Sequence, residues 1–346
     1  MSAPAPAVWM PAVRCGTGAD VFTERLAAAL AERGIRCEVT WLPHRAEYAP
    51  WSVPVPSPPS WANVVHINSW LPPRFVPDKL PLVVTVHHCV HDPDASEHAS
   101  LAQRLYHRTL ILGREAHNIK MAVSVTAVSR FTARRVAEVF SVRQPEVIHN
   151  GIDADTFSPP PVKRNPHTPF RLLFVGSWTR RKGADLLSAI MAHLDEGFEL
   201  TCVSRPSFLQ RLHIRPPPNT RWLGSLGRQE LADAYRSADA LLLPSRLEGF
   251  GLVACEAMAC GTPVLASRCS SLPEIIDDGR TGILCEPDNP SAFAAAARLL
   301  RDNPCLWHAL SESAAARAHT CFRTRNMVDA YIALYRRSLL HASTHT

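Results

Sequence analysis

The sequence lacks several features that would assign it to a particular class of protein. None of its apolar runs reaches the roughly 18 residues that a membrane-spanning helix needs. Its first residues lack the basic region and long apolar stretch of a signal peptide. Its ten cysteines are scattered and include no C-x-x-C pair, so neither a zinc ribbon nor a redox motif is indicated. We therefore expect reduced cysteines, many of them in the core, and a cytoplasmic location.

The net charge also does not identify a binding partner. The formal net charge is +6 at pH 7, which permits an anionic partner without identifying one. No recognisable nucleic-acid-binding module accompanies this charge, so no nucleic acid is expected as a partner. With 346 residues, of which 46% are hydrophobic, the chain is long enough for two domains with sizeable cores.

Short apolar stretches alternate with helical patterns in both halves of the chain. Residues 64–67, 82–86 and 171–175 have the composition of buried strands, and apolar residues between 22 and 30 recur at helical spacing. This alternation predicts an α/β fold with parallel sheets covered by helices on both faces. A proline-rich stretch near residue 159 predicts a linker between two domains.

The most informative stretch is 245–273, which reads as a turn, a helix and a strand. Gly249 and Gly251 open the helix, so its unpaired N–H groups and positive dipole end are accessible to an anion. Glu248 lies just outside that end, and Glu256 lies about 12 Å farther along a helix. Two carboxylates at this separation suit hydroxyl groups on both sides of a diphosphate, as in a nucleotide sugar. The competing interpretation is a capped core helix with two solvated glutamates.

A glycine pair, Gly16 and Gly18, follows the first candidate strand and leaves two interpretations open. It could begin a dinucleotide-binding fingerprint, but Val21 occupies the sixth position, where glycine or alanine is expected. Glu38 stands at the start of the second strand, whereas a ribose-binding acid belongs near its end. A tight turn is the alternative.

Three histidines, His87, His88 and His91, directly follow the strand at 82–86 within the stretch 84–94. His87 and His91 could approach a metal ion, but no acidic or sulfur ligand set accompanies them convincingly. We therefore expect no metal site here. The alternative to any functional role is that these histidines are polar residues of a loop.

In their order along the chain, these motifs resemble the retaining glycosyltransferases of family 4, the group 1 glycosyltransferases with the GT-B fold. The most specific match is E-x7-E within EGFGLVACEAMACGTPVLAS. VIHNGID at 147–153 is similar to the family's Val-Ile-Pro-Asn-Gly-Val-Asp near the interdomain hinge. The resemblance implies two Rossmann-like domains whose parallel sheets face each other across a cleft. It assigns 1–158 to an acceptor-side domain, 159–169 to the linker, 170–322 to a nucleotide-sugar-binding domain and 323–346 to a helix that crosses back.

The resemblance also implies residue roles in the second domain. The loop at 176–183 is not a Walker A motif, which ends in Gly-Lys-Ser/Thr; it is similar to the family's Val-Gly-Arg-x5-Lys-Gly, whose Arg and Lys clamp the donor diphosphate. Lys182 matches the lysine, while Ser177 stands where arginine is usual, so Arg180 or Arg181 would have to substitute. Glu248 would hold the donor sugar's hydroxyl groups, and Glu256 the ribose.

In the first domain, Gly16 and Gly18 match a glycine-rich loop beside the donor diphosphate and the acceptor. His87 matches a histidine that reaches toward the donor sugar, but His88 replaces the usual aspartate, so either His87 or His91 has this role. The implied catalytic residues are Glu248, Lys182 and His87. The implied donor-binding residues are Gly16, Gly18, Arg181, Lys182, Glu248, Gly249, Phe250, Gly251, Leu252, Val253 and Glu256.

The implied function is transfer of a sugar, with retention of configuration, from a nucleoside-diphosphate sugar to a hydroxyl acceptor such as a lipid-linked or polysaccharide precursor. Neither a metal nor a cofactor is expected, because Lys182 and the helix N-terminus can stabilise the departing diphosphate. Basic residues dominate 100–143 and could hold the protein on an anionic membrane surface, unless they only solvate helix faces. The alternatives are a non-catalytic nucleotide-sugar-binding or scaffold protein and a dinucleotide oxidoreductase.

Overall fold

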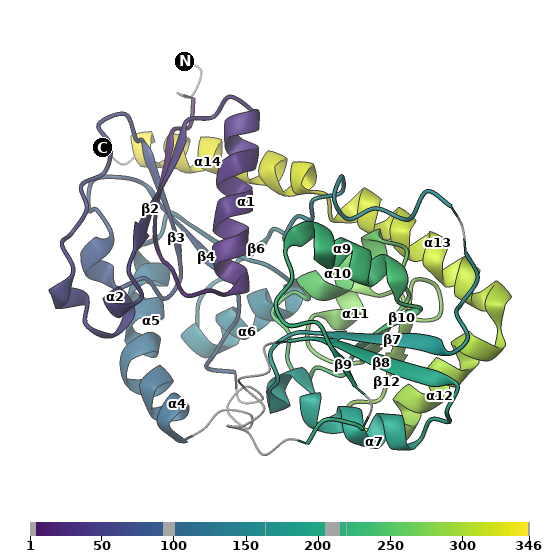
Figure 1. Cartoon of the computed structure of the whole chain (residues 1–346). Coiled ribbons are helices and arrows are strands. Elements are labelled where there is room, and N and C mark those ends of the chain that lie inside the picture. Colours follow the sequence, from purple (N-terminus) through teal and green to yellow (C-terminus); the bar gives the residue numbers. More distant parts are fainter. Residues whose placement is uncertain (1–4, 93–100, 163, 205–214, 219, 345–346) are drawn as a thin grey trace. The chain divides into compact units, whose positions relative to one another are not determined.

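A computed structural model describes residues 5–92, 101–162, 164–204, 215–218 and 220–344 (Figure 1). The end of the histidine-containing stretch, residues 93 and 94, therefore lies outside the described residues, as do the last two residues of the chain. The chain divides into two compact units. The first comprises Met1–Gly151 with Thr324–Thr346, and the second comprises Ile152–Arg323. None of the helices in the described ranges is both long and apolar enough to cross a bilayer.

The first unit is built on a six-stranded sheet with the order β2-β1-β3-β4-β5-β6, in which every pairing is parallel. Its central strands are buried along their whole length, as the apolar runs in the sequence predict. The strands are β1 (Val8–Val13), β2 (Cys37–Leu42), β3 (Val64–Asn68), β4 (Leu82–Val86), β5 (Ser124–Ala127) and β6 (Glu146–Val147).

Helices of the first unit cover this sheet. They are α1 (Gly18–Glu32), α2 (Arg45–Tyr48), η1 (Pro50–Ser52), η2 (Pro73–Phe75), α4 (Leu101–Tyr106), the π-helical η3 (His107–Ile111), α5 (Leu112–Met121), α6 (Arg130–Phe140) and α14 (Thr324–Thr344). Helix α14 packs beside α1 in the same core, where Tyr331 and Tyr335 are fully buried with Phe22. The face of α14 that packs in this core is therefore apolar.

The second unit has its own six-stranded parallel sheet, with the order β12-β11-β10-β7-β8-β9. Figure 1 shows helices on both faces, with α9 and α10 on one and α7 and α12 on the other. The strands are β7 (Phe170–Val175), β8 (Phe198–Val203), β9 (Arg221–Trp222), β10 (Ala240–Leu243), β11 (Val264–Ser267) and β12 (Ile283–Cys285). The helices are η4 (Arg180–Lys182), η5 (Ala184–Leu186), α7 (Leu187–Ala192), α9 (Arg228–Ser237), α10 (Leu252–Ala259), α11 (Leu272–Ile275), α12 (Pro290–Asp302) and α13 (Pro304–Cys321).

The order of strands reverses at one point in each sheet. In the second unit the chain runs outward from β7 through β8 to β9, returns to β10 beside β7, and continues outward on the other side. In the first unit β1 and β3 lie on either side of the corresponding point. Ligands of such sheets bind outside the carboxyl ends of the strands at this reversal. In the second unit, the loops that follow β7 and β10 therefore form the candidate ligand site.

Candidate functional site

Two side chains from the loops after β7 and β10 form a close ion pair. The Nζ atom of Lys182 lies 2.6 Å from Oε1 of Glu248, and the two side chains are only 15% and 7% exposed. These residues are 66 positions apart in the sequence. The topology brings them together because β7 and β10 are neighbours with their carboxyl ends at the same edge.

The backbone of the first loop fixes Lys182. Thr179 accepts a hydrogen bond from the Lys182 N–H through its carbonyl oxygen at 3.1 Å and forms the cap of η4. Gly183 then adopts a left-handed conformation with φ +69°, and a Cβ atom there would lie 2.0 Å from the carbonyl oxygen of Pro244. Only glycine allows this close approach, so the two loops are held directly against each other.

Two serines that follow β11 hold the loop of Glu248. The backbone N–H of Glu248 donates to Oγ of Ser270 at 3.0 Å. The hydroxyl of Ser271 lies 3.0 Å from the carbonyl oxygen of Glu248 and 2.8 Å from that of Phe250. The sequence carries no signal for these hydrogen bonds, which join residues more than 20 positions apart.

Helix α10 begins directly after this loop. Its N-cap is Gly251 in a left-handed conformation with φ +102°, and glycine has no side chain to cap the first N–H groups. A Cβ atom at Gly251 would lie 3.2 Å from side-chain atoms of Leu272 and Ile275. Leu252 and Val253, the first helical residues, are only half-buried. The positive end of the α10 dipole therefore lies beside the ion pair.

Both glutamates of the E-x7-E motif are buried. Glu248 and Glu256 are each 6% exposed, so the interpretation as two solvated glutamates is wrong. The hydroxyl of Tyr235 donates to Oε2 of Glu256 at 3.5 Å, from the neighbouring helix α9. Glu248 lies in the loop before α10, and Glu256, eight residues later, lies within the helix.

The ion pair alters the pKa of both partners. Burial lowers the pKa of Lys182, and the charge of Glu248 offsets this only in part. Burial alone would raise the pKa of Glu248, but the charges of Lys182 and Arg181 outweigh it, so the pKa is lowered. Glu248 is therefore a carboxylate at neutral pH, held in a site with excess positive charge.

The arginines in the loops after β7 and β10 differ in their exposure and in their partners. Arg181 donates from Nη1 to the carbonyl oxygen of Leu247 at 3.0 Å, whereas Arg180 is exposed. Arg181 thus lies close to the ion pair, and its charge acts on both partners. Arg246, which the sequence analysis missed, donates to Asp185 at 2.7 Å and pairs with Asp288 at 2.6 Å, which ties the two loops together.

In the first unit, the predicted glycine pair lies between β1 and α1. Gly16 is left-handed with φ +70° and donates its N–H to Oδ2 of Asp20 at 2.7 Å. Gly18 is the first residue of α1. A Cβ atom at either glycine would meet nothing within 4 Å. The left-handed backbone, and not steric crowding, therefore explains why glycine occupies position 16. Both glycines are surrounded by open space.

His87 lies at the carboxyl end of β4, beside the end of β3. Its Nε2 atom donates to Oδ1 of Asn68 at 2.8 Å, and its ring packs edge-on against Phe22 at 4.6 Å between centroids. Burial lowers the pKa of His87 to about 3, so the imidazole is neutral at physiological pH. Asn68 was not among the predicted residues.

His91 is held away from His87 by a different partner. Its Nε2 atom lies 3.1 Å from Oε2 of Glu115, and Ser69 donates its hydroxyl to the other oxygen of that carboxylate. Both members of the His91–Glu115 pair are buried, with side chains 9% and 1% exposed. This pairing gives His91 a role in packing α5 against the loops after β3 and β4.

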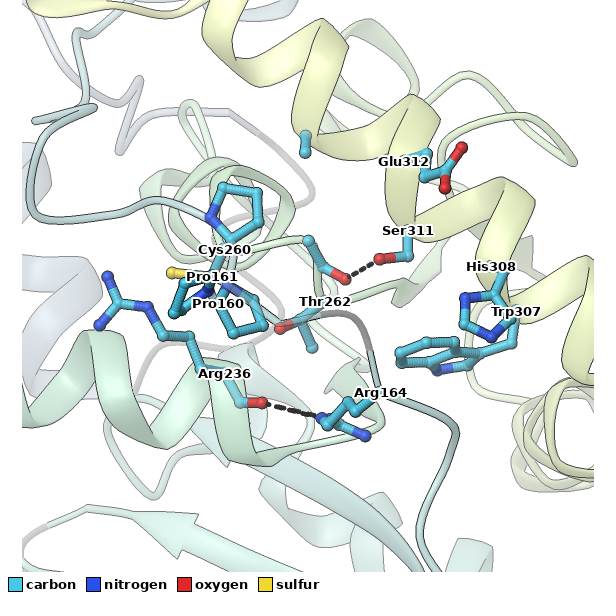
Figure 2. Close-up of a pocket in the computed structure, with 13 residues that line it drawn as sticks. Pro160, Pro161, Arg164, Arg236, Cys260, Thr262, Trp307, His308, Ser311 and Glu312 are labelled. Atoms are coloured by element: carbon cyan, nitrogen blue, oxygen red, sulfur yellow. Dashed lines mark hydrogen bonds between the residues drawn. The ribbon is translucent and has the colours of Figure 1, made fainter.

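A pocket of about 370 Å³ lies elsewhere in the second unit (Figure 2). Pro159, Pro160, Pro161, Trp307 and His308 line it, and none of the predicted site residues does. Its two arginines are engaged internally: Arg164 pairs with the buried Asp239, and Arg236 donates to the carbonyl oxygen of Ser158 at 2.8 Å. The pocket is therefore mainly apolar.

Two family models match the chain. Residues 169–303 match the model described as "Glycosyl transferases group 1". Residues 60–156 match the model described as "Glycosyltransferase Family 4". The two matches lie in different halves of the chain, so both halves carry the similarity.

Curated relatives extend this similarity. The chain is 31% identical over 293 residues to the glycogen synthase of Mycobacterium tuberculosis, a match that covers 80% of this chain and 69% of that protein. It is 36% identical over 200 residues to the D-inositol 3-phosphate glycosyltransferase of Streptomyces avermitilis, over 51% of this chain and 43% of that protein. The chain thus spans about half the length of several of the curated relatives it matches.

Solved structures share the whole fold. A sucrose-phosphate synthase from Thermosynechococcus elongatus aligns with a TM-score of 0.77 at 20% identity, over 98% of this chain and 100% of that chain. The Anabaena protein HepE, solved in complex with UDP-glucose, aligns with a TM-score of 0.67 at 17% identity, over 96% and 99% of the two chains. At these identities the likeness concerns the fold.

Proposed function

We propose that this chain, which belongs to the group 1 glycosyltransferases of family 4 and has their GT-B fold, transfers a sugar from a nucleoside-diphosphate sugar to a hydroxyl acceptor. The observation that carries the proposal is the buried Lys182–Glu248 pair beside the N-terminus of α10. A cation, a carboxylate and a helix dipole at the reversal point of a parallel sheet suit a ligand that joins a diphosphate to hydroxyl groups.

Each part of the donor has a complementary group in this unit. Lys182 and the first N–H groups of α10 bind the diphosphate, with Arg181 adding positive charge nearby. Glu248 accepts hydrogen bonds from hydroxyls of the transferred sugar, and Glu256 from the ribose. The residues of the loop between the glutamates, Gly249, Phe250 and Gly251 with Leu252 and Val253, contribute backbone groups to the same donor.

During transfer, the bond between the anomeric carbon and the diphosphate oxygen breaks, and its electron pair remains on the diphosphate. The acceptor oxygen bonds to the anomeric carbon on the same face, so the configuration is retained, and its proton passes to the leaving phosphate. Preorganised positive charge lowers the barrier because negative charge develops on the leaving group. Lys182 and α10 supply this charge, so we assign no metal and no cofactor to the reaction.

In the first unit, we assign the sugar-contacting role to His87 and not to His91. His91 is paired with the buried Glu115, whereas His87 is a neutral imidazole whose Nε2 atom is oriented by Asn68. With Nε2 donating to Asn68, the Nδ1 atom of His87 is the acceptor available for a sugar hydroxyl. Gly16 and Gly18 leave open space at the start of α1 for donor or acceptor atoms.

Thermal unfolding in the presence of UDP, GDP, ADP, CMP and NAD tests the donor assignment. A ligand at 100 times its dissociation constant stabilises the folded protein by about 2.7 kcal/mol, which is enough to rank the panel. We expect one nucleoside diphosphate to raise the melting temperature selectively, and Glu256→Ala to remove this shift. Since HepE was solved with UDP-glucose, UDP-glucose is the first donor to test for transfer.

The possible outcomes separate the competing functions. A shift only with NAD would favour an oxidoreductase. Diphosphate binding without hydrolysis or transfer, over a broad panel of acceptors, would favour a non-catalytic binding or scaffold protein. Sugar transfer that is retained in full by Lys182→Ala would remove Lys182 from the mechanism.

A lipid-linked acceptor and a peripheral position at the inner face of the cell membrane form the second part of the proposal. On α4, Leu101 and Leu105 are 78% and 64% exposed beside the exposed Arg104. Exposed leucine and arginine on one helix suit an anionic bilayer surface. By contrast, Arg135 pairs with Asp92 and is not part of this face.

Sedimentation with vesicles tests this assignment. We expect the protein to sediment with phosphatidylglycerol vesicles and not with phosphatidylcholine vesicles, and Leu105→Asp to abolish sedimentation. Equal sedimentation of Leu105→Asp and the unaltered protein would exclude α4 as the contact.

A further inference from the structure

A cysteine, a histidine and a glutamate converge at the edge of the first unit's sheet, outside the residues assigned to sugar transfer. The Sγ atom of Cys15 lies 3.4 Å from Oε2 of Glu47, and Nε2 of His44 lies 3.6 Å from the same oxygen. All three atoms lie within 4.8 Å of one another. Among the described residues, this is the one group of three such ligands at this spacing.

The fold accounts for this convergence. Cys15 follows β1, and His44 and Glu47 follow β2 around the short helix α2. Because β1 and β2 are parallel neighbours, their carboxyl ends meet at one edge. Only His87 and His91 could be named as possible metal ligands from the sequence, because Cys15 and Glu47 are 32 residues apart and share no local motif.

The two distances from Oε2 of Glu47 are those expected between ligands around one small metal ion, and the third pair of atoms lies within 4.8 Å. In tetrahedral zinc sites, bond lengths of about 2.0–2.3 Å place neighbouring ligand atoms roughly 3.3–3.8 Å apart. The two distances to Oε2 of Glu47 fall in this interval. A thiolate and an imidazole favour zinc over magnesium or calcium, which take oxygen ligands.

We propose that Cys15, His44 and Glu47 bind a zinc ion through three protein ligands and leave one coordination position to water. Three ligands with one open position is an established zinc arrangement. Zinc replaces the proton of the Cys15 thiol, which passes to solvent, and the thiolate becomes the ligand. No oxidation or reduction is involved.

Neighbouring groups already hold two of the three ligands in place. Tyr106 donates its hydroxyl to Oε1 of Glu47 at 2.7 Å, which leaves Oε2 turned toward Cys15 and His44. Asp20 accepts the backbone N–H of Cys15 at 3.0 Å. Such outer contacts orient metal ligands and strengthen binding.

A metal ion can reach the group from solvent. The side chain of His44 is 55% exposed, whereas that of Glu47 is only 14% exposed. The hydroxyl of Tyr48 lies 3.2 Å from Nε2 of His44 and must turn away when zinc binds. Tyr48 is itself 51% exposed, so it has room to do so.

Titration of the full-length, reduced, chelator-treated protein with zinc, in competition with a chromophoric chelator, tests the proposal. We expect one tight equivalent, and at least a tenfold loss of affinity in both Cys15→Ser and His44→Ala. Cys305→Ser and His117→Ala are matched controls, because both residues are exposed and lie outside the group, and they should bind zinc as the unaltered protein does.

Cobalt gives a second readout of the same site. Bound to the unaltered protein, Co²⁺ should show the near-ultraviolet absorption of a thiolate–cobalt bond, and Cys15→Ser should lose it. Absence of this band in the unaltered protein, or its survival in Cys15→Ser, overturns the proposal, as does full zinc affinity in His44→Ala. His44 is exposed, so its substitution keeps the test valid if the cysteine variant fails to fold.

Discussion

Replacing Lys182 with methionine tests the central ion pair most directly. The substitution keeps an unbranched side chain, one atom shorter, but leaves the Glu248 carboxylate, 7% exposed, without its partner at 2.6 Å. Removing one partner of a buried pair typically costs about 3–5 kcal/mol, because the remaining charge is uncompensated. In addition, loss of one group that stabilises developing negative charge typically lowers kcat by about 100- to 1000-fold.

The double variant Lys182→Met/Glu248→Gln separates the two effects. It removes both charges, so we expect it to regain at least about 1 kcal/mol of the stability lost in the single variant. Sugar transfer should stay as low as in the single variant, because the cation is still missing. Lys79→Met is the control, since Lys79 is exposed and should change neither property.

Hydrogen exchange of amides in the second unit measures the change in opening free energy, and initial rates of sugar transfer measure the activity. A single variant as stable as the unaltered protein would refute the view that the pair is buried and coupled. A double variant that is less stable than the single variant would show that the cost comes from lost packing and not from the unpaired carboxylate.

Three further predictions concern the surroundings of the site. Gly183→Ala should prevent the loop from adopting its native structure, because its Cβ atom would lie 2.0 Å from the carbonyl oxygen of Pro244. Gly224 has a similar φ but nothing within 4 Å, so Gly224→Ala should lower the free energy of urea unfolding by only about 1–2 kcal/mol. Ser271→Ala should cost about 1–3 kcal/mol by hydrogen exchange, since it removes the buried hydroxyl bonded to two carbonyl groups. Acidification from pH 6.5 toward 4 should destabilise the first unit through His87 and the buried His66, by up to about 1.4 kcal/mol per pH unit for each, because both folded pKa values, about 3, lie below the unfolded value. His87→Gln should therefore reduce the pH dependence of urea unfolding and leave the part due to His66, and an unchanged slope would contradict this.

Most of the fold could be predicted from local patterns. Buried strands appear in the sequence as short apolar runs, so β4 was predicted with its observed bounds. The site was predictable where it is contiguous: Glu248 through Glu256 form one loop and one helix whose spacing is fixed by the sequence.

Contacts between distant segments could not be predicted. The serine hydroxyls that hold the loop of Glu248, the amide of Asn68 at His87 and the carboxylate of Glu115 at His91 all come from other elements. Polar side chains of this kind have many candidate partners in a sequence, and only the packing of strands and helices selects one. For the same reason, the sequence left open whether the two glutamates are buried.

The ion pair also bears on which ligands the proposed site selects. A buried pair is weak evidence for stability, because desolvating two charges offsets most of their attraction. A simple anion that took Lys182 would leave the Glu248 carboxylate buried and unpaired, and a free sugar that took Glu248 would do the same to Lys182. Only a ligand with an anionic group and hydroxyl groups side by side replaces both partners at once. The 2.6 Å contact therefore favours an intact nucleotide sugar over a simple anion or a free sugar. Inorganic phosphate and free sugar should each bind more weakly than the donor by well over tenfold.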